Sequence, residues 1–419
     1  MAIATQSVTA ICRAAKRAAR ELATIDSATK NAALLAMAEA LEARAPEILE
    51  ANARDLDAGR ESRLSSALMD RLALDPGRVA AMAAGVRDIV ALQDPVGEVL
   101  DGFRLPNGLD VRKVRVPLGV VAVVYEARPN VTIDAAALAL KSGNAIVLRG
   151  SSSAAHSNAV LAAVAIEAVE AAGLPPGALS LVAGGGREEL AELATQDGFV
   201  DLIIPRGGEG LKAALSAVAT VPVIYAASGN CHVYVDATAD LDSARGIVVN
   251  AKVQRPGVCN AAETLLVHSD VADAFLPPVF EDLRDAGVEL RGDERVRAVD
   301  GAVADATEED WATEYLALVL AVRVVDSVED AIEHIGAYGS GHSEAIVTGA
   351  TTAARAFQLG VDAACVYVNA STRFTDGGQF GMGAEIGNST QKLHARGPIG
   401  LRELCTFKYL VEGDGQVRP

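Results

Sequence analysis

From Val120 onward, short apolar runs alternate with longer amphipathic segments. VVAVVY at 120–125, AIVLRG at 145–150, LSLVAG at 179–184 and DLIIP at 201–205 predict buried strands. The segments between them carry apolar residues at helical spacing and predict helices. Buried strands that alternate with helices indicate a parallel sheet, because a parallel crossover needs a connection as long as a helix. The pattern therefore predicts a doubly wound α/β domain.

A second series of the same kind begins near Cys231. The runs HVYVD, ETLLVH, LALVLAVRVV, EAIVTG and ACVYVN predict strands, and amphipathic segments again lie between them. At 419 residues the chain is longer than one hydrophobic core usually supports. We therefore expect two α/β domains that meet near residue 230.

The remaining segments have other patterns. Residues 27–52 and 75–92 repeat apolar positions at helical spacing and predict helices. Residues 102–119 alternate apolar and charged positions around Asn107-Gly108, which predicts a hairpin whose two turn positions both accept positive φ. The C-terminal tail contains a β-like stretch, CTFKYLVE, that could pair with this hairpin.

Composition excludes several classes of function. The formal net charge of -18 disfavours binding to nucleic acid or to an anionic membrane, because both need a concentrated positive patch. The start of the chain lacks the unbroken apolar segment of a signal peptide, and no later run approaches the length of a membrane span. We expect a cytoplasmic protein.

The five cysteines are odd in number and far apart, which argues against a disulfide framework and offers no metal-binding spacing. Cys259 differs from the rest, because it follows a Pro-Gly turn in a polar loop between a predicted helix and a predicted strand. Arg255 lies nearby and favours the thiolate, so Cys259 is the candidate nucleophile. Cys12 and Cys365 fit apolar patterns and are interpreted as packing residues, whereas Cys231 and Cys405 stay open.

No G-x-G-x-x-G or Walker A motif occurs in the chain. The run IIPRGGEGLK instead places glycines at the start of a predicted helix, where backbone N–H groups and Arg206 could bind phosphate. VLRGSSSAAHSN places Arg149 and three serines at a strand end, which suits an adenosine ribose or its 2′-phosphate. A capped helix start with no ligand is the alternative.

Several motifs occur in one order along the chain: GVVAVVYEARPN, SGNAIVLRGS, GLPPGALSLVAG, GVCNAAETLLVH, YVNASTRF and FGMGAEIGNST. Together they resemble the aldehyde dehydrogenase superfamily over nearly the whole chain. Two stretches, YEARPNVTIDAAALALKSGNA and RGPIGLRELCTFKYL, resemble sequences of one branch of this superfamily. Enzymes of that branch reduce L-glutamyl 5-phosphate to L-glutamate 5-semialdehyde in proline biosynthesis. The resemblance implies an oxidoreductase that uses NADPH, with an aldehyde dehydrogenase-like fold.

The resemblance also implies a domain organisation. The cofactor-binding domain would comprise residues 1–102 and 127–229, and the catalytic domain residues 230–390. Residues 103–126 and 391–419 would form a small β element through which a homo-oligomer assembles. Glutamate 5-kinase is an expected functional partner, because it would supply the phosphorylated substrate.

The resemblance assigns roles to individual residues. The nucleophile falls on Cys259, and the amide that stabilises the oxyanion falls on Asn130, with Glu126 as the alternative. Glu314 matches a glutamate beside the nicotinamide ribose. Residues matched to the rest of the cofactor are Arg149 and Ser151 near the adenosine ribose, and Pro205, Arg206, Gly207 and Gly208 under the pyrophosphate.

One departure from the family separates the alternatives. Relatives that oxidise aldehydes carry a glutamate that activates water, whereas the matching stretch here, AASGNC at 226–231, has no carboxylate. This absence favours acyl phosphate reduction over the oxidation of a small aldehyde to an acid. A catalytically silent interaction scaffold is a third reading, which the complete Cys259 loop disfavours. Three arginines could bind the substrate's phosphate or α-carboxylate, although each could equally form a surface ion pair: Arg128, Arg255 and Arg373.

Overall fold

The computed structural model describes residues 7–184, 186–225 and 228–418. The chain divides into two units. The first unit comprises Met1–Tyr225, Gly381–Gly387 and Ile399–Pro419, and the second comprises Ala226–Phe380 and Asn388–Pro398. The polypeptide therefore passes between the units four times, at residues 225/226, 380/381, 387/388 and 398/399.

The first unit begins with helices, as predicted. Their bounds are α1 (Val8–Leu22), α2 (Ser27–Ala43), α3 (Ala45–Glu61), α4 (Ser66–Leu72) and α5 (Pro76–Ala91). The predicted helical segment 27–52 is divided at Arg44, because Pro46 lies in the first turn of α3, where a residue without an N–H group starts a helix and cannot continue one.

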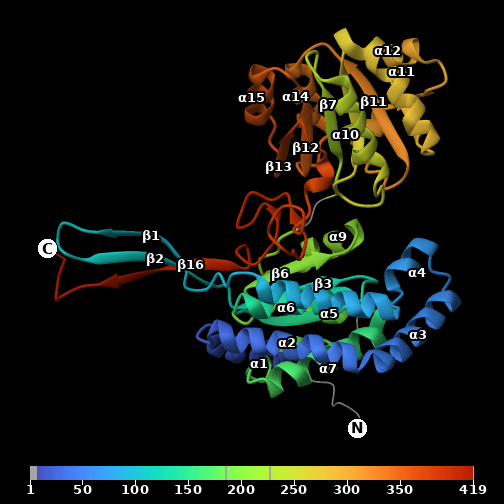
Figure 1. Cartoon of the computed structure of the whole chain (residues 1–419). Helices are drawn as coiled ribbons and strands as arrows, with labels where there is room; N and C mark the ends of the chain where they lie inside the picture. Colours follow the sequence, from blue (N-terminus) through green and yellow to red (C-terminus); the bar gives the residue numbers. More distant parts are fainter. Residues whose placement is uncertain (1–6, 185, 226–227, 419) are drawn as a thin grey trace. The chain divides into compact units, whose positions relative to one another are not determined.

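A four-stranded parallel sheet forms the centre of this unit (Figure 1). Its strands are β3 (Val120–Tyr125), β4 (Ala145–Gly150), β5 (Leu179–Leu181) and β6 (Leu202–Arg206), in the order β5-β4-β3-β6. The connecting helices are α6 (Asn130–Lys141), α7 (Ala155–Ala171) and α8 (Arg187–Ala194), and α9 (Glu209–Val218) follows β6. Right-handed crossovers put α6 and α7 on one face, and the reversal of strand order after β5 puts α8 on the other. The unit is therefore doubly wound, as the sequence predicts.

The register of this sheet positions the candidate cofactor residues. Tyr125 at the end of β3 pairs with Gly150 at the end of β4 and with Arg206 at the end of β6. The segments that carry Arg149 and Arg206 thus meet at the carboxyl edge of the sheet, where ligands bind in open α/β folds.

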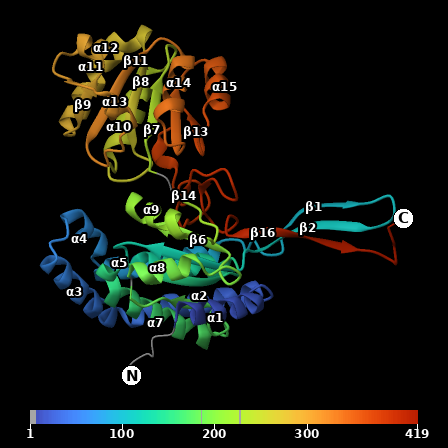
Figure 2. The ribbon, with the colours of Figure 1, turned by 180° about the vertical axis from the view of Figure 1, so that it is seen from behind.

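The second unit contains a seven-stranded parallel sheet in the order β10-β9-β11-β8-β7-β12-β13. Its strands are β7 (Cys231–Val235), β8 (Ala262–His268), β9 (Glu289–Gly292), β10 (Ala304–Asp305), β11 (Val319–Val325), β12 (Ser343–Val347) and β13 (Cys365–Val368). Its helices are α10 (Leu241–Val253), α11 (Ser269–Asp285), α12 (Glu294–Val299), α13 (Glu308–Ala312), α14 (Val328–Tyr338) and α15 (Thr351–Gly360). Figure 2 shows α10, α11, α14 and α15 beside this sheet. Apolar side chains of α10 and α11 form one buried cluster with the strands, and those of α14 and α15 form another.

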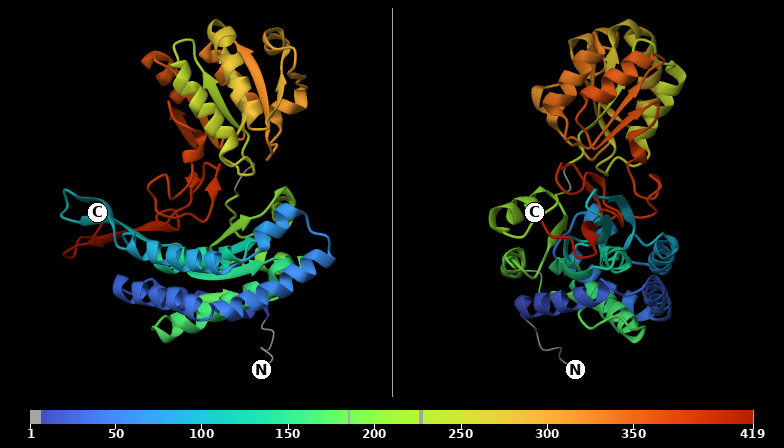
Figure 3. Two further views of the ribbon diagram at one scale, coloured as in Figure 1. Left: turned by 45° about the vertical axis from the view of Figure 1, so that its right-hand side comes forward. Right: turned by 90° about the vertical axis from the view of Figure 1, so that its left-hand side faces the viewer.

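The predicted hairpin exists and pairs with the C-terminal tail. β1 (Val99–Arg104), β2 (Asp110–Pro117) and β16 (Cys405–Glu412) form an antiparallel sheet in the order β1-β2-β16. Figure 3 shows β16, far along the sequence, beside β2. The predicted turn is wrong in one detail, because only Gly108 has a positive φ, of 92°. The loop closes by a hydrogen bond from the N–H of Leu105 to the carbonyl of Leu109, so it is longer than a two-residue turn.

The observed boundaries differ from the expected ones at two places. Residues 103–126 are not one element, because Val120–Tyr125 is the β3 strand of the four-stranded sheet. Near the C-terminus, Gly381–Gly387 belong to the first unit, whereas Asn388–Pro398 belong to the second, through the short pair β14 (Asn388–Ser389) and β15 (Gly397–Pro398). The functional names of the domains stay predictions.

The described part of the chain contains neither a membrane-spanning helix nor a cluster of metal-binding side chains. Across residues 7–184, 186–225 and 228–418, no helix has the length and apolar character to cross a membrane. The same residues contain no group of three or more His, Cys, Asp or Glu side chains that could hold a metal ion.

A buried ion pair joins α2 to the segment after α5 in the first unit. Lys30 Nζ lies 2.5 Å from Asp94 Oδ2, and these side chains are 1% and 10% exposed. Asp94 also accepts hydrogen bonds from Ser27 Oγ at 2.6 Å and from the N–H of Val96 at 3.0 Å.

We expect Asp94→Asn to lower the free energy of unfolding by about 3–5 kcal/mol, because the Lys30 ammonium would be left buried without its countercharge. Denaturant unfolding followed by circular dichroism measures this loss. Glu50→Gln is the matched control: Glu50 pairs with Arg54 at the surface, so this change should cost under about 1 kcal/mol. Equal costs for the two variants would contradict the prediction.

Candidate active site

Cys259 lies in the loop between α10 and β8, in the second unit. Its side chain is half-buried, whereas Cys12, Cys231, Cys365 and Cys405 are buried. Burial raises the pKa of Cys12 and of Cys405 to about 12 and that of Cys231 well above its usual value, which disfavours their thiolates. The interpretation of Cys12 and Cys365 as packing residues agrees with their burial, and Cys259 is the thiol best placed to react.

The backbone of Cys259 contacts two residues at the start of β7: Gly229, just before the strand, and Cys231, its first residue. Cys231 Sγ donates a hydrogen bond to the carbonyl oxygen of Cys259 at 3.2 Å. Gly229 packs so closely against the same peptide that a Cβ added there would lie 1.5 Å from the carbonyl oxygen of Cys259. Gly229 belongs to the AASGNC stretch, of which Ala226 and Ala227 lie outside the described residues.

Glu314 is tied to this arrangement. Its Oε1 accepts the N–H of Gly229 at 2.6 Å. Gly229 therefore contacts both Glu314, the candidate ribose ligand, and the peptide of Cys259, the candidate nucleophile. The structure therefore brings together Cys259, Glu314 and the stretch in which relatives carry the water-activating glutamate. The predicted contact of Glu314 with a ribose stays a prediction.

Two of the three candidate substrate arginines, Arg255 and Arg373, lie within electrostatic range of each other, and Arg373 also lies within range of Cys259. Burial and the nearby charge of Arg255 lower the pKa of Arg373, while Cys259 raises it. Arg373 Nε also donates to Gln254 Oε1 at 2.9 Å, at the start of the cysteine loop. These positive groups favour an anion beside Cys259. Arg128 belongs to the first unit, where it is half-buried between β3 and α6.

The candidate adenosine residues lie at the carboxyl end of β4. Arg149 is 6% exposed, and its Nη2 donates to the carbonyl of Gly186 at 2.5 Å. Burial lowers the pKa of Arg149, while the carboxylates of Glu189 and Glu126 oppose this effect. Ser151 Oγ accepts the N–H of Ala127 at 3.2 Å and shares a hydrogen bond with Ser153 Oγ at 2.7 Å.

The candidate pyrophosphate turn begins α9. Pro205 is buried in β6, Arg206 ends that strand, and Gly207 and Gly208 precede the helix. The N–H of Gly208 donates to Glu126 Oε2 at 3.1 Å. A Cβ on Gly207 would lie 2.6 Å from the same oxygen, so a larger residue there would require the Glu126 side chain to move. The turn thus binds a negatively charged oxygen, which is the chemistry that a phosphate requires.

Asn130 opens α6, as predicted. Its Nδ2 donates to Asp134 Oδ2 at 2.8 Å, one helical turn further along. Burial raises the pKa of Asp134 to about 6, while Asn130 and Arg206 act in the opposite direction. Glu126, the alternative to Asn130, instead contacts the glycine turn.

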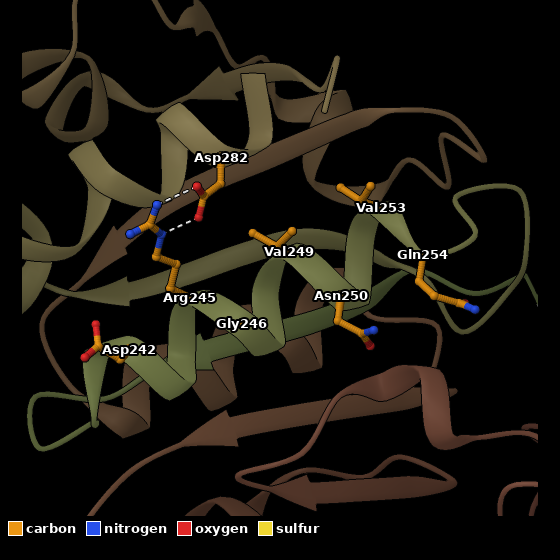
Figure 4. A pocket seen from close by; sticks show the side chains of 8 residues that line it. All are labelled: Asp242, Arg245, Gly246, Val249, Asn250, Val253, Gln254 and Asp282. Carbon is orange, nitrogen blue, oxygen red and sulfur yellow. Dashed lines mark hydrogen bonds and ion pairs between the residues drawn. The ribbon is translucent and has the colours of Figure 1, made fainter. Parts of the chain in front are cut away.

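A separate groove runs along the exposed side of α10 (Figure 4), with a volume of about 590 Å³. It extends from Asp242 to Gln254 and is bordered by the ion pair of Arg245 with Asp282. Its lining contains none of the predicted site residues, and Gln254 at its end accepts a hydrogen bond from Arg373.

Sequence reasoning missed several residues that hold the site together. Asp134 could have been found from its spacing of four residues from Asn130, which puts both on one helical face. Gly229 and Cys231 gave no signal, because their contact with Cys259 joins positions far apart in sequence.

Comparison with known proteins identifies the family. Residues 1–317 match the family described as "Aldehyde dehydrogenase family". The chain belongs to the aldehyde dehydrogenase family. Its sequence is 59% identical over 404 residues to the gamma-glutamyl phosphate reductase of Moorella thermoacetica, covering 96% of this chain and 97% of that one. It is 56% identical over 413 residues to the protein of the same name from Thermobifida fusca, covering 99% of each.

Solved structures agree with this assignment. The crystal structure of gamma-glutamyl phosphate reductase from Thermotoga maritima has a TM-score of 0.97 and 47% identity, covering 99% of this chain and 100% of that one. An acetylating aldehyde dehydrogenase from Geobacillus thermoglucosidasius, at 19% identity and a TM-score of 0.71, shares the fold, covering 98% and 97%. The predicted aldehyde dehydrogenase-like fold, and the resemblance to an enzyme of this branch, are confirmed.

We expect Gly229→Ala to lower kcat/KM by on the order of a hundredfold, because the added methyl group must displace the Cys259 peptide. Steady-state kinetics with the acyl phosphate substrate measure the effect. Gly246→Ala on the exposed face of α10, where a Cβ meets nothing within 4 Å, is the control and should keep wild-type activity. Full activity of Gly229→Ala would show that this contact does not position the loop.

Proposed function

We propose that this chain reduces L-glutamyl 5-phosphate to L-glutamate 5-semialdehyde, with release of phosphate, in proline biosynthesis. The relatives that support the proposal carry the name gamma-glutamyl phosphate reductase at 52–59% identity. The observation in the structure that carries it is the half-buried Cys259 side chain, whose backbone carbonyl contacts Gly229 and Cys231 and whose thiol lies within electrostatic range of Arg373.

The chemistry follows from a thiolate at Cys259. The sulfur attacks the acyl carbon of the substrate, a C–S bond forms, and the C–O bond to phosphate breaks, which gives a thioester and inorganic phosphate. After reduction of the thioester carbon, the hemithioacetal collapses, the C–S bond breaks, and the aldehyde and the thiolate are released. The departing phosphate takes up the proton that balances the reaction. Water activation is not needed, which fits the absence of a carboxylate from AASGNC.

A nicotinamide cofactor supplies the hydride when bound, and we propose that it is NADPH. The residues at the carboxyl edge of the first sheet fit such a group. The N–H of Gly208 in the glycine turn already donates to a carboxylate oxygen of Glu126, and Arg149 and Ser151 lie at the carboxyl end of β4 in the same sheet. Arg206 and Pro205 would shape the pyrophosphate turn, and Glu314 would contact the nicotinamide ribose.

Asn130 would stabilise the oxygen charge that develops when the thiolate attacks, together with the N–H of Cys259. The bond from Asn130 to Asp134 supports this role, because it fixes the amide plane. Arg255 and Arg373, with Arg128, would bind the substrate's phosphate or α-carboxylate.

The proposed reaction predicts a dependence on phosphate. In the reverse direction, oxidation of glutamate 5-semialdehyde should require added phosphate or arsenate, because the thioester has no activated water to hydrolyse it. In the forward direction, reduced cofactor should be consumed when glutamate 5-kinase, ATP and glutamate supply the labile substrate. Absorbance of the reduced cofactor measures both reactions.

Cys259→Ser is the control variant, because an unassisted serine hydroxyl is a poor nucleophile, and it should be inactive while still binding cofactor. Aldehyde oxidation at full rate without phosphate would favour an aldehyde dehydrogenase that forms an acid. No turnover in either direction, with Cys259 unreactive, would favour a silent scaffold.

We expect Arg149→Ala to raise the KM for NADPH by roughly ten- to a hundredfold and to change the KM for NADH much less, because a charged hydrogen bond to the 2′-phosphate is lost. Steady-state kinetics with both cofactors measure the difference. Arg149→Lys keeps the charge and should retain part of the preference for NADPH. An equal rise for both cofactors would show that Arg149 does not distinguish them.

The proposed function extends to cellular location, the enzyme that supplies the substrate, and oligomeric state. We propose a cytoplasmic location and a functional coupling to glutamate 5-kinase, since that reaction class must supply the acyl phosphate. We also propose a homo-oligomer that assembles through β1, β2 and β16. Exposed apolar side chains support this interface: Val99, Phe103, Phe407, Tyr409 and Val411.

A further inference from the structure

Two charged side chains are completely buried at the two stems of the Cys259 loop. Lys252 is the next-to-last residue of α10, and Glu263 is the second residue of β8. Lys252 Nζ lies 2.5 Å from Glu263 Oε2, and both side chains are 0% exposed. The ion pair therefore closes the segment of chain that carries the nucleophile.

Glu263 reaches a second part of the site. Its Oε1 accepts the N–H of Leu316 at 3.2 Å, two residues after Glu314. Glu314 in turn accepts the N–H of Gly229, which packs against the Cys259 peptide. One buried carboxylate thus connects the stem of the nucleophile loop with the segment of the candidate cofactor ligand.

Stability alone does not account for this pair. The free-energy cost of transferring two charges into the interior is about as large as the gain from their attraction. Replacing such a pair by apolar residues of similar volume is often neutral or stabilising. The pair instead fixes the conformation of the loop. Both oxygens of Glu263 have hydrogen-bond partners, Lys252 and the N–H of Leu316, so the two stems of the Cys259 loop are held in one arrangement.

We propose that Lys252 and Glu263 are a positioning pair that fixes Cys259 and couples its loop to the Glu314 segment. This inference rests on the proposed function, in which Cys259 carries the glutamyl group. The pair does not touch the reacting atoms and acts through the loop and through the peptide of Leu316.

The decisive variant replaces both residues, Lys252→Met with Glu263→Leu. Because it leaves no buried charge, this variant should fold with a Tm near the wild-type value. Alkylation of Cys259 by iodoacetamide, followed by peptide mapping, should nevertheless slow by at least about tenfold, because the loop no longer has one fixed position. We expect kcat for acyl phosphate reduction to fall more than KM changes.

Glu263→Gln is the second variant. Burial lowers the pKa of Lys252 and Glu263 opposes that shift, so the substitution removes the countercharge and sets the amide's donor against the ammonium. We expect slower alkylation together with lower stability. Asp94→Asn is the matched control, because it breaks a buried lysine–carboxylate pair of equal length in the first unit. It should lose stability but keep the alkylation rate of Cys259.

The experiment distinguishes a failure of the positioning role from a failure of the proposed function. A folded Lys252→Met/Glu263→Leu protein with wild-type alkylation and kcat would overturn the positioning role and leave the proposed function standing. The same slowing in Asp94→Asn would also overturn it, because the effect would then be general destabilisation. A wild-type Cys259 that is no more reactive than the four buried cysteines would overturn the proposed function, and this inference with it.

Discussion

The position of Cys259 relative to its helix and sheet is the constraint that the rest of the second unit must satisfy. The thiol follows the C-terminal end of α10 and precedes the first residue of β8, so it lies at the amino edge of the parallel sheet. The backbone dipole at the C-terminal end of a helix repels an anion. A thiolate there needs positive charge from side chains, and under the proposed function Arg255 and Arg373 would supply it from the loop and from the segment after β13. The buried Lys252 lies at the same helix end.

The two units use opposite edges of their sheets. In the first unit, the glycine turn and Arg149 lie at the carboxyl edge, where helix N-termini offer N–H groups to an anion. In the second unit, Cys259 lies at the amino edge of the sheet, where the strands begin. β7, β12 and β13 start at this edge with Cys231, Ser343 and Cys365. Under the proposed function, anion binding in the first unit would use backbone N–H groups, whereas in the second unit it would depend on side chains, which substitutions can remove.

Sequence patterns predicted the elements that have a strong periodicity. The buried runs at β3, β4 and β8 and the amphipathic helices α2, α5 and α10 all form as expected, since apolar burial determines them. The short elements β9, β10, α12 and α13 were not predicted, because their few residues carry no clear period. The predicted strand at 316–325 begins only at Val319, because Leu316 adopts a φ of 53° that no strand accommodates. Within the site, Cys259 and Asn130 were identifiable from local pattern and resemblance. Lys252 and Glu263 were not, because a charged residue within an amphipathic run does not reveal whether it is buried.

The pairing of β16 with β2 has a consequence for synthesis on the ribosome. Arg112 and Glu412, which form an ion pair across these strands, are 300 positions apart. At typical rates of elongation, β2 waits roughly 15 to 60 seconds before its second neighbour is made. Throughout that time one margin of the nascent hairpin presents unpaired amide and carbonyl groups to the cell. Charged side chains on an edge strand disfavour pairing with other chains. β2 carries three of them, Arg112, Lys113 and Arg115, so its unpaired edge is protected before β16 is made.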